Sequence, residues 1–376
     1  MIKGGIDIVN KEPLLAFLAF VALFAGTAFC AESSTSNVTQ IASMEPFQVE
    51  NWGSFWTVDL QGERFFAAYA EGGHLWESSI DADLTKSGQL SRVLIDEVED
   101  RVFTSGTPLE LEEGYELAIQ SIDLDGNRVF VQLMKEGAVV DSALVEPSGE
   151  GADIDDKTYT YTADLGDAEK IAIVAVHFKN SFRGADRDMA TVDGIWQISD
   201  TLAEIGEGEV RVPQWRNFER DDWGHFYTLE AEGEEYFAVY SEDGCLSDVS
   251  REPDLVKHNL LSRIIYDDGQ ERTFTSGTSL GLEEGYELAI ESIDLFGNKV
   301  YVELLKDGRV VDAEIIYAGV PGATAEEKTY TYTRDLGGAE DVVTLAVHFE
   351  RSFRGADQDL ATIDGIWQIS ETPISI

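Results

Sequence analysis

The feature that most constrains the fold of this chain is an internal duplication. Residues 111–119 are Leu-Glu-Glu-Gly-Tyr-Glu-Leu-Ala-Ile and return unchanged at residues 282–290, so the copies are offset by 282 − 111 = 171 residues. The same offset maps residues 193–199, Asp-Gly-Ile-Trp-Gln-Ile-Ser, onto residues 364–370. This period is far longer than the roughly 20–50 residues of solenoid or propeller repeats. Each copy is therefore predicted to be a domain with its own core.

The N-terminus has the features of a secretory signal peptide. An apolar run from Leu14 to Phe29 follows two lysines and ends in small residues, and no equally long apolar run occurs again. We therefore predict a signal peptide at residues 1–31, with an uncleaved N-terminal anchor as the alternative. Residues 32–45 are rich in Ser and Thr and are predicted to be flexible.

The chain is strongly acidic. It has 72 Asp and Glu residues against 27 Lys and Arg, which gives a formal net charge of −45. Such a polyanion repels nucleic-acid phosphates and attracts cations, so nucleic-acid binding is excluded. Adaptation to a saline habitat produces the same charge balance, because salt screens the repulsion between surface carboxylates. Composition therefore leaves habitat and function as two explanations of the acidity.

Within each copy, turn residues separate short segments of alternating polarity. In the first copy, residues 115–124, 128–135 and 138–145 are separated by Asp-Gly and Glu-Gly pairs. Such turns need positive φ and are typical of β-hairpins. No long segment shows a helical stripe. The fold is predicted to be all-β, with two tandem homologous repeats.

Each repeat is predicted to contain β-sandwiches, because many short strands separated by turns favour that architecture. About a dozen strands per repeat is too many for one small sandwich, so we expect two sandwich subdomains in each. The first duplication domain is placed at residues 46–200 and the second at 217–372. The acidic, turn-rich residues 201–216 are predicted to be a linker.

The motifs shared by both copies carry a family resemblance. The signal peptide, the two Leu-Glu-Glu-Gly-Tyr-Glu-Leu-Ala-Ile segments, the Val-Val-Asp segments and the closing Gly-Ile-Trp-Gln-Ile-Ser together resemble the S-layer duplication-domain family of methanogenic archaea, over about residues 47–372. The resemblance implies an extracellular, non-enzymatic structural subunit of an archaeal S-layer lattice, or an accessory to one. Its implied partners are further copies of itself or other S-layer subunits.

One departure from the family pattern concerns attachment. Members that build the lattice carry a polar tether and a C-terminal membrane helix, whereas this sequence stops at Ile376, a few residues after Trp367. We therefore expect no C-terminal transmembrane anchor in this chain. Three alternatives follow, namely attachment through lattice neighbours, a secreted accessory subunit, or a paralogue that never forms the main lattice.

Residues 123–127, Asp-Leu-Asp-Gly-Asn, imitate the start of a calcium-binding loop, where closely spaced oxygen ligands flank a glycine turn. The second copy has Phe296 where Asp125 stands, and Met134 occupies the position of the distal glutamate of an EF-hand. A simple turn is therefore favoured. Calcium that bridges acidic faces between subunits stays open as a cofactor, because hard cations prefer carboxylate oxygens.

Arginines stand near acids at matching positions of both copies, namely residues 181–186 with 352–357, and Arg92 and Asp96 with Arg263 and Asp267. A glycosidase with two carboxyl groups about the scissile bond is the enzymatic alternative. In so acidic a chain, ion pairs that fix loops are favoured. We assign no catalytic, cofactor-binding or metal-binding residue.

Histidine and cysteine also lack a catalytic pattern. His177 and His348 end apolar strands in both copies, and a zinc site with three or four ligands is poorly supported, so packed histidines are predicted. Cys245 is matched by His74 in the first copy. After signal removal Cys245 is the only cysteine, so no internal disulfide is expected.

A secreted carbohydrate-binding or adhesin module is the alternative function, because exposed aromatic rings stack on sugars. The eligible tryptophans are Trp52, Trp56, Trp196 and Trp215. Trp52 and Trp196 recur in apolar strand contexts of the second copy, which indicates core filling. Asn37 lies in an Asn-Val-Thr sequon and is the candidate N-glycosylation acceptor.

Overall fold

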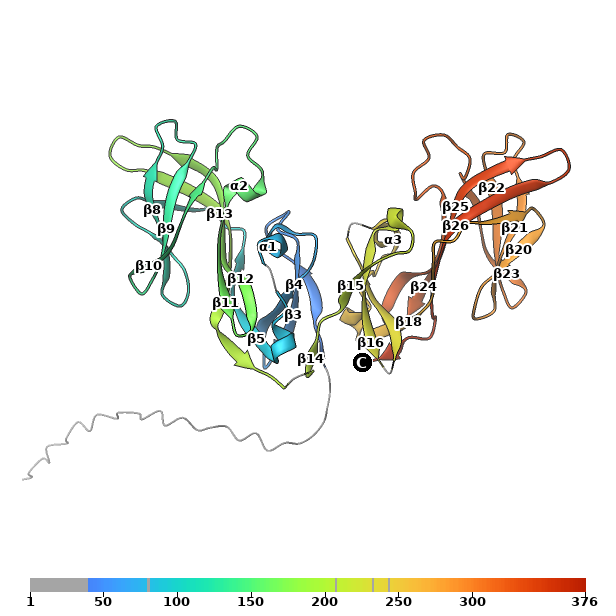
Figure 1. The fold of residues 1–376 in the computed structure, drawn as a ribbon, viewed down its shortest axis with the longest axis horizontal. Helices are drawn as coiled ribbons and strands as arrows, with labels where there is room; N and C mark the ends of the chain where they lie inside the picture. Colours follow the sequence, from blue (N-terminus) through green and yellow to red (C-terminus); the bar gives the residue numbers. More distant parts are fainter. Residues whose placement is uncertain (1–39, 80–81, 207, 232, 243) are drawn as a thin grey trace, which may run out of the picture. The chain divides into compact units, whose positions relative to one another are not determined.

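The computed structural model describes residues 40–79, 82–206, 208–231, 233–242 and 244–376 (Figure 1). The predicted signal peptide and the Asn37 sequon lie outside these residues. Strands dominate the described chain, which confirms the all-β prediction. Its helices are single short turns, with bounds α1 His74–Glu77, η1 Leu84–Ser87, α2 Ile154–Lys157, η2 Asp221–Trp223, α3 Cys245–Val249 and η3 Val256–His258. None of the described helices has the length and apolarity needed to cross a membrane.

The first repeat contains a large antiparallel sheet of eight strands. Their order is β11-β12-β13-β5-β4-β3-β2, and β6 pairs with β13. Their bounds are β2 Ser43–Pro46, β3 Ser54–Leu60, β4 Glu63–Tyr69, β5 Gln89–Glu97, β6 Arg101–Thr104, β11 Thr158–Leu165, β12 Ala168–Phe182 and β13 Met189–Glu204.

The predicted meander forms a separate four-stranded sheet in the order β10-β9-β8-β7. Along β8, buried Tyr115, Leu117 and Ile119 alternate with more exposed side chains, because successive residues of a strand point to opposite faces. One face of this sheet is therefore buried and the other faces solvent. The bounds are β7 Leu109–Glu110, β8 Tyr115–Ile122, β9 Val129–Lys135 and β10 Ala138–Val145.

The second repeat has the same two sheets. Its large sheet has nine strands in the order β15-β16-β17-β18-β26-β25-β24, with β19 on β26 and β27 on β18, and its small sheet has the order β20-β21-β22-β23. The bounds are β15 Gln214–Asn217, β16 His225–Ala231, β17 Glu234–Tyr240, β18 Leu260–Asp268, β19 Arg272–Thr275, β20 Thr278–Gly281, β21 Tyr286–Ile293, β22 Val300–Lys306, β23 Arg309–Ile316, β24 Thr329–Leu336, β25 Ala339–Arg354, β26 Asp359–Ile369 and β27 Ile374–Ser375.

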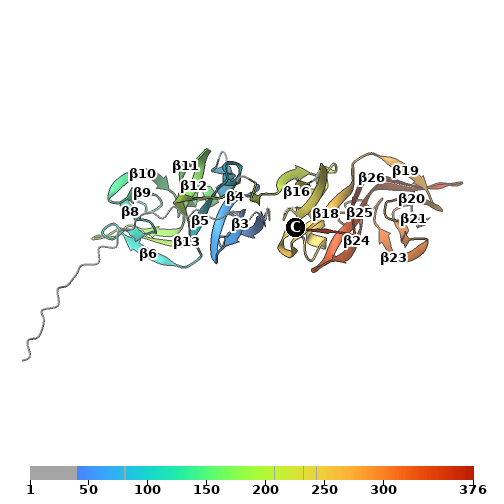
Figure 2. The same cartoon turned by 90° about the horizontal axis from the view of Figure 1, so that it is seen from below.

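In each repeat one long hairpin pairs within the large sheet and also packs against the small sheet. β12 and β13 have 15 and 16 residues, and β25 has 16. Figures 1 and 2 both show the β25–β26 hairpin running from the large sheet towards the strands of the small one. Residues 171–176 of β12 are all buried, so both faces of that strand are covered there. The long hairpins thus make each pair of sheets one continuous structure.

Buried clusters reveal two packing units in the second repeat. The small sheet packs with Val347, Phe349 and Ile363 in one cluster, and the large sheet forms another around Trp223, Phe226 and Trp367. In the first repeat the corresponding residues merge into one cluster. The predicted two sandwich subdomains are therefore distinct cores in the second repeat and a fused core in the first.

The repeats meet through matching residues. Trp56 and Tyr227 occupy equivalent positions and pack edge to face with ring centroids 5.1 Å apart. Around them a shared cluster includes Val58 and Leu229, which are also equivalent. Apolar faces of both repeats are thereby removed from water, which favours their association.

Two expectations about connecting segments need correction. Residues 40–45, expected to be flexible, contain β1 (Gln40–Ile41) and most of β2, and β1 pairs in parallel with β14 (Val210–Arg211). The predicted linker at 201–216 contains the end of β13, β14 and part of β15. Polar composition suggested loops, but tertiary pairing satisfies these backbone groups as strands.

Candidate structural site: the clasp between the sheets

The repeated Leu-Glu-Glu-Gly-Tyr-Glu segment lies between β7 and β8 and contacts β13. The side chain of Gln197 on β13 is fully buried. Its Oε1 accepts a hydrogen bond from the Glu112 backbone N–H at 2.8 Å, and its Nε2 donates to the Glu112 carbonyl at 3.0 Å. One amide thus satisfies both backbone groups of one residue, as buried polar groups require.

Glu113 makes the next contact. Its backbone adopts φ 54°, followed by Gly114 with φ 75°, a tight left-handed turn in which glycine carries no steric cost. The Glu113 carboxylate accepts from the Ser199 hydroxyl at 2.7 Å and from the Asp200 backbone N–H at 3.3 Å. The strained turn therefore aims a charged acceptor at the end of the buried part of β13.

Asp200 completes the clasp, which we define as Glu112, Glu113, Tyr115, Gln197, Ser199 and Asp200. The Tyr115 hydroxyl donates to Asp200 at 2.8 Å, and Lys135 forms an ion pair with the same oxygen. Burial alone would raise the pKa of Asp200, but the hydrogen bonds from Lys135 and Tyr115 lower it overall. Burial and the bond to Asp200 raise the pKa of Tyr115. The hydroxyl therefore stays protonated and acts as a donor.

The second repeat repeats the clasp almost atom for atom. Gln368 holds the Glu283 backbone at 3.0 and 3.1 Å, and Glu284 accepts from the Ser370 hydroxyl at 2.7 Å. Glu371 replaces Asp200 and is bound by Tyr286 and by Lys306, the latter at 2.9 Å. Although the Glu371 side chain is one methylene longer than that of Asp200, the equivalent tyrosine and lysine bind it. The clasp is thus conserved between the repeats as a geometry.

A second attachment joins the far end of each long hairpin to the β8–β9 turn. The Ser181 hydroxyl donates to the Gly126 carbonyl at 2.6 Å, and Arg183 donates to the Ile122 carbonyl at 3.0 Å. Ser352 and Arg354 make the same bonds at 2.7 and 3.2 Å. The arginine therefore fixes a loop, as predicted, but through a backbone carbonyl.

The calcium-like segment is a turn. Asp123 accepts hydrogen bonds from the backbone N–H groups of Asn127 and Arg128 at 2.8 and 3.1 Å, and Asp294 does the same for Asn298 and Lys299 at 2.7 and 3.0 Å. These bonds from the backbone groups four and five residues further along the chain close the hairpin loop. Among the described residues, no group of three or more His, Cys, Asp or Glu side chains is arranged to hold a metal ion.

A third attachment was missed by the sequence analysis. The Tyr159 hydroxyl on β11 donates to Asp141 on β10 at 2.8 Å, and Tyr330 donates to Asp312 at 2.8 Å. The signal was present in the sequence, because the Thr-Tyr-Thr-Tyr-Thr and Val-Val-Asp segments are both identical in the two copies. The contacts of Gln197, Glu113 and Tyr115 were not predicted either, although all three residues lie in the repeated motifs. These contacts explain why the motifs recur.

The expected pairing of Arg92 with Asp96 is wrong. Arg92 lies beside Glu63 at 3.4 Å, whereas Asp96 is bound by Arg64 at 3.4 Å and by the Gln48 backbone N–H at 3.2 Å. The two side chains lie four residues apart on a strand, where sequence spacing sets the face but bulges between β5 and β13 change the partners.

The histidines are packed, as predicted. His177 contacts Asp193 at 2.6 Å and His348 contacts Asp364 at 2.5 Å. Burial lowers the pKa of His348, although the bond to Asp364 opposes that shift. Burial raises the pKa of the Cys245 thiol to about 11, so this thiol is a poor nucleophile at neutral pH.

The tryptophans do not form an exposed platform. Trp52, Trp56 and Trp196 are buried, and Trp215 is 37% exposed. In the first repeat Trp196 packs against Phe55 and Phe47 with centroid distances of 4.7 and 4.8 Å. Core filling is therefore the role of the three buried tryptophans, as predicted for Trp52 and Trp196.

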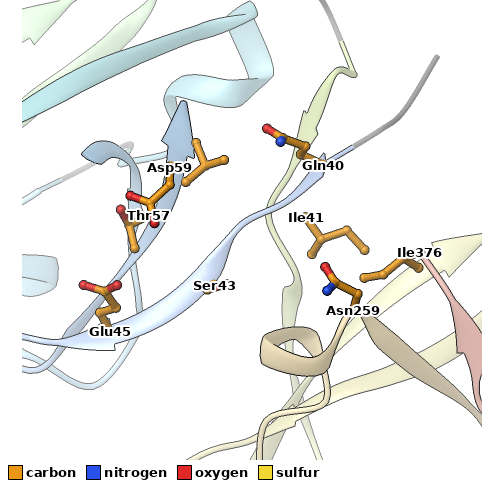
Figure 3. Close-up of a pocket in the computed structure, with 9 residues that line it drawn as sticks. Gln40, Ile41, Ser43, Glu45, Thr57, Asp59, Asn259 and Ile376 are labelled. Atoms are coloured by element: carbon orange, nitrogen blue, oxygen red, sulfur yellow. The ribbon is translucent and has the colours of Figure 1, made fainter. Parts of the chain in front are cut away.

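A pocket of about 330 Å³ lies between β2–β3 and the segment that ends at Ile376 (Figure 3). Its two carboxylates are Glu45 and Asp59, and Glu45 is paired with Arg64 at 2.9 Å. Glycoside hydrolysis needs one carboxyl group as acid and a second as base or nucleophile. The ion pair fixes the Glu45 carboxylate beside Arg64 of β4.

Both repeats of this chain match a known protein family. Residues 32–211 and 210–376 each match the family model described as S-layer protein. The Major S-layer proteins of Methanosarcina acetivorans, Methanosarcina mazei and Methanosarcina barkeri are 24%, 23% and 23% identical to this chain. The alignments cover 80% of this chain and 60% of each relative. The chain therefore spans about 60% of the length of these curated relatives.

Proposed function

Because the chain belongs to the S-layer protein family, we propose that it is a structural subunit of an S-layer, located outside the cell and assembled from many copies. The observation that carries this proposal is that each family match coincides with one clasped pair of sheets. A lattice subunit needs domains that transmit load without deforming. Hydrogen bonds to buried groups at three attachments per repeat supply such rigidity.

The net charge of −45 suits a lattice with acidic pores. Openings lined by carboxylates would concentrate cations and exclude anions, by the focusing that acts in charged clefts. Divalent cations such as calcium would also bridge acidic faces of neighbouring copies, because they bind carboxylate oxygens. In this proposal, cations are partners between subunits, and the chain performs no chemical step.

A carbohydrate-binding module is the weaker proposal, since three of its four eligible tryptophans are buried. A sugar platform needs accessible ring faces. Trp215 alone among the four keeps substantial exposure, and it packs beside His225 at a centroid distance of 5.1 Å.

The direct test is assembly. The full chain, produced in a secreting host, is followed by electron microscopy and light scattering across salt and calcium concentrations, alone and with purified cell envelopes. Ordered sheets or saturable incorporation into an envelope would support the structural role. A monomer that ignores envelopes under all conditions would refute it, and glycan binding would then be measured.

A further inference from the structure

Exposed apolar side chains concentrate at one place in each repeat. The six most exposed large hydrophobic side chains among the described residues lie in the β8–β9 and β21–β22 turns, on the ends of β12 and β25 that are bound to those turns, and on β6. They are Leu124 at 85%, Phe296 at 84%, Leu295 at 78%, Val102 at 65%, Phe353 at 61% and Phe182 at 59%. Folded chains seldom leave such groups in water without a binding role.

In the first repeat two of these side chains, Val102 and Phe182, share one face with Met189, which is 37% exposed. Phe182 pairs with Met189 across the hairpin, and Met189 pairs with Thr104, two residues from Val102 on β6. Phe103 and Ala190, on the opposite face, are buried. We call Val102, Phe182 and Met189, with Arg187 on the adjoining loop, the first tip. Its loop is held by the Ser181 and Arg183 hydrogen bonds, so the apolar groups sit on a fixed support.

A second exposed apolar surface covers the outer face of the small sheet. In the second repeat, Tyr301 pairs with Ile315 and Leu305 pairs with Val310 across β22 and β23. Tyr301, Val310 and Ile315 are 36%, 54% and 53% exposed. We call these four side chains, with Glu287 and Glu303 between them, the second sheet face. The first repeat has the equivalent apolar residues Phe130, Met134, Val139 and Leu144.

Charge separates the matched surfaces of the two repeats. Residues 179–189 contain three basic and two acidic residues, whereas the equivalent residues 350–360 contain two basic and three acidic. Arg187 of the first tip corresponds to Gln358, and Lys179, which pairs with Asp100 at 2.9 Å, corresponds to Glu350. The first hairpin is therefore one of the few net positive segments of a chain with a charge of −45.

The outer faces of the two small sheets differ in the same sense, with more acidic residues in the second repeat. Glu303 of the second sheet face corresponds to Gln132 in the first repeat, and exposed Glu291 corresponds to Gln120. The second face is therefore the more acidic of the two. Opposite charges steer two surfaces together, while like charges disfavour other pairings. Of the four combinations of tip and face, the first tip with the second sheet face is the complementary one.

We propose that the first tip of one copy docks on the second sheet face of a neighbouring copy. The inference rests on the proposed function and names its contact. Both surfaces are exposed within the described chain, so neither is covered by the other repeat. A contact between two different surfaces is heterologous, and repetition of such a contact generates rings or open arrays. Each subunit would thus offer one donor surface and one acceptor surface.

The test uses full-length variants in sedimentation velocity and electron microscopy. Phe182→Asp and Tyr301→Asp each place a charge in the contact, and each is expected to raise the concentration needed for assembly by about tenfold or more. Phe353→Asp and Phe130→Asp are matched controls at the equivalent positions, and each is expected to shift it less than about threefold. All four side chains are exposed, so thermal unfolding is expected to be unchanged.

Mixing the variants tests the direction of the contact. A chain with Phe182→Asp keeps an acceptor, and a chain with Tyr301→Asp keeps a donor, so their mixture is expected to form 1:1 dimers that grow no further. Likewise, Arg187→Glu and Glu303→Lys are each expected to weaken assembly, and the double variant to recover it.

Several results would overturn the proposal. Equal effects at Phe182 and Phe353, absence of the capped dimer, or failure of the double variant to recover would refute this contact while assembly of the wild-type chain preserved the proposed function. A wild-type chain that stays monomeric would refute both. Loss of binding to zwitterionic lipid vesicles in Phe182→Asp, with assembly intact, would reassign the tip to a lipid surface.

Discussion

In the first repeat Arg64 on β4 binds Glu45 on β2, and at the equivalent positions of the second repeat Glu235 and Arg216 form the pair with their charges exchanged. Both repeats therefore contain an ion pair at these positions, but the acidic and basic residues have exchanged strands. Clasp residues that bind backbone groups, such as Gln197 and Gln368, are identical. Backbone groups have fixed polarity and need a fixed partner, whereas an exposed ion pair needs only opposite charges.

The exchange has a consequence for a neighbouring acid. Burial raises the pKa of Asp96, but Arg64 lies 3.4 Å away and opposes the shift. Burial raises the pKa of Asp267 to about 6, and Glu235 adds to the shift in the place where Arg64 stands in the first repeat. Both carboxylates therefore have a raised pKa, but the charge on β4 or β17 opposes the shift at Asp96 and adds to it at Asp267.

The largest expected loss of stability comes from substitutions in the cores of the two repeats. Trp196→Ala is expected to destabilise the first repeat by about 3–5 kcal/mol, and Trp367→Ala to do the same in the second, because each removes a fully buried ring. Denaturant unfolding monitored by fluorescence measures both. Since the first repeat has one merged core and the second has two, Trp196→Ala is expected to unfold its whole repeat. A loss confined to the large sheet of the first repeat would contradict the merged core.

The next test breaks the clasp. Gln197→Leu leaves the Glu112 N–H and carbonyl without partners and is expected to cost about 2–3 kcal/mol. Gln368→Leu serves as the matched variant and is expected to cost the same. Amide hydrogen exchange at Glu112 and Glu283 reports the local opening. Unchanged protection at these amides would mean that the clasp does not hold the sheets together.

A smaller effect is expected from Asp267→Asn. The raised pKa of Asp267 means that its contribution to stability is present below about pH 3.8 and is lost as the pH rises through about 6. The variant should therefore be more stable than wild type at pH 8, by about 1 kcal/mol after allowance for partial exposure, and the difference should vanish near pH 4. Asp96→Asn is the control, because it also loses the Arg64 contact and should gain less. Equal gains at both positions would contradict the role of the exchanged charges.

The smallest effect on stability is expected from exchanging the charges of the Arg64–Glu45 ion pair. Arg64→Glu alone should cost about 0.2–1 kcal/mol, and the double variant Arg64→Glu with Glu45→Arg should recover most of it. The double variant should also raise the pKa of Asp96 towards that of Asp267, which carboxyl NMR titration measures. An unmoved Asp96 would show that burial alone sets the difference.

Much of the fold was predictable from local pattern. Asp-Gly and Glu-Gly turns located the β8–β9–β10 meander because they need positive φ, which the structure shows at Gly126, Glu136 and Gly137. The strands at residues 40–45 and 210–217 were not predicted, since polar composition hides their strand pattern and only the pairing reveals it, as between β1 and β14 or between β15 and β16. The Arg92 pairing failed for a similar reason, because a bulge moved Asp96 towards Arg64.

The sequence by itself determined the duplication, the all-β fold and the buried tryptophans, because each depends on composition and spacing along one strand or turn. Only the tertiary structure decided that Gln197 holds Glu112 across 85 positions of sequence, that Arg183 binds a carbonyl, and that Phe182 lies in solvent. Periodicity reports which residues share a face. It carries no record of which distant backbone group that face meets, because those partners are set by packing.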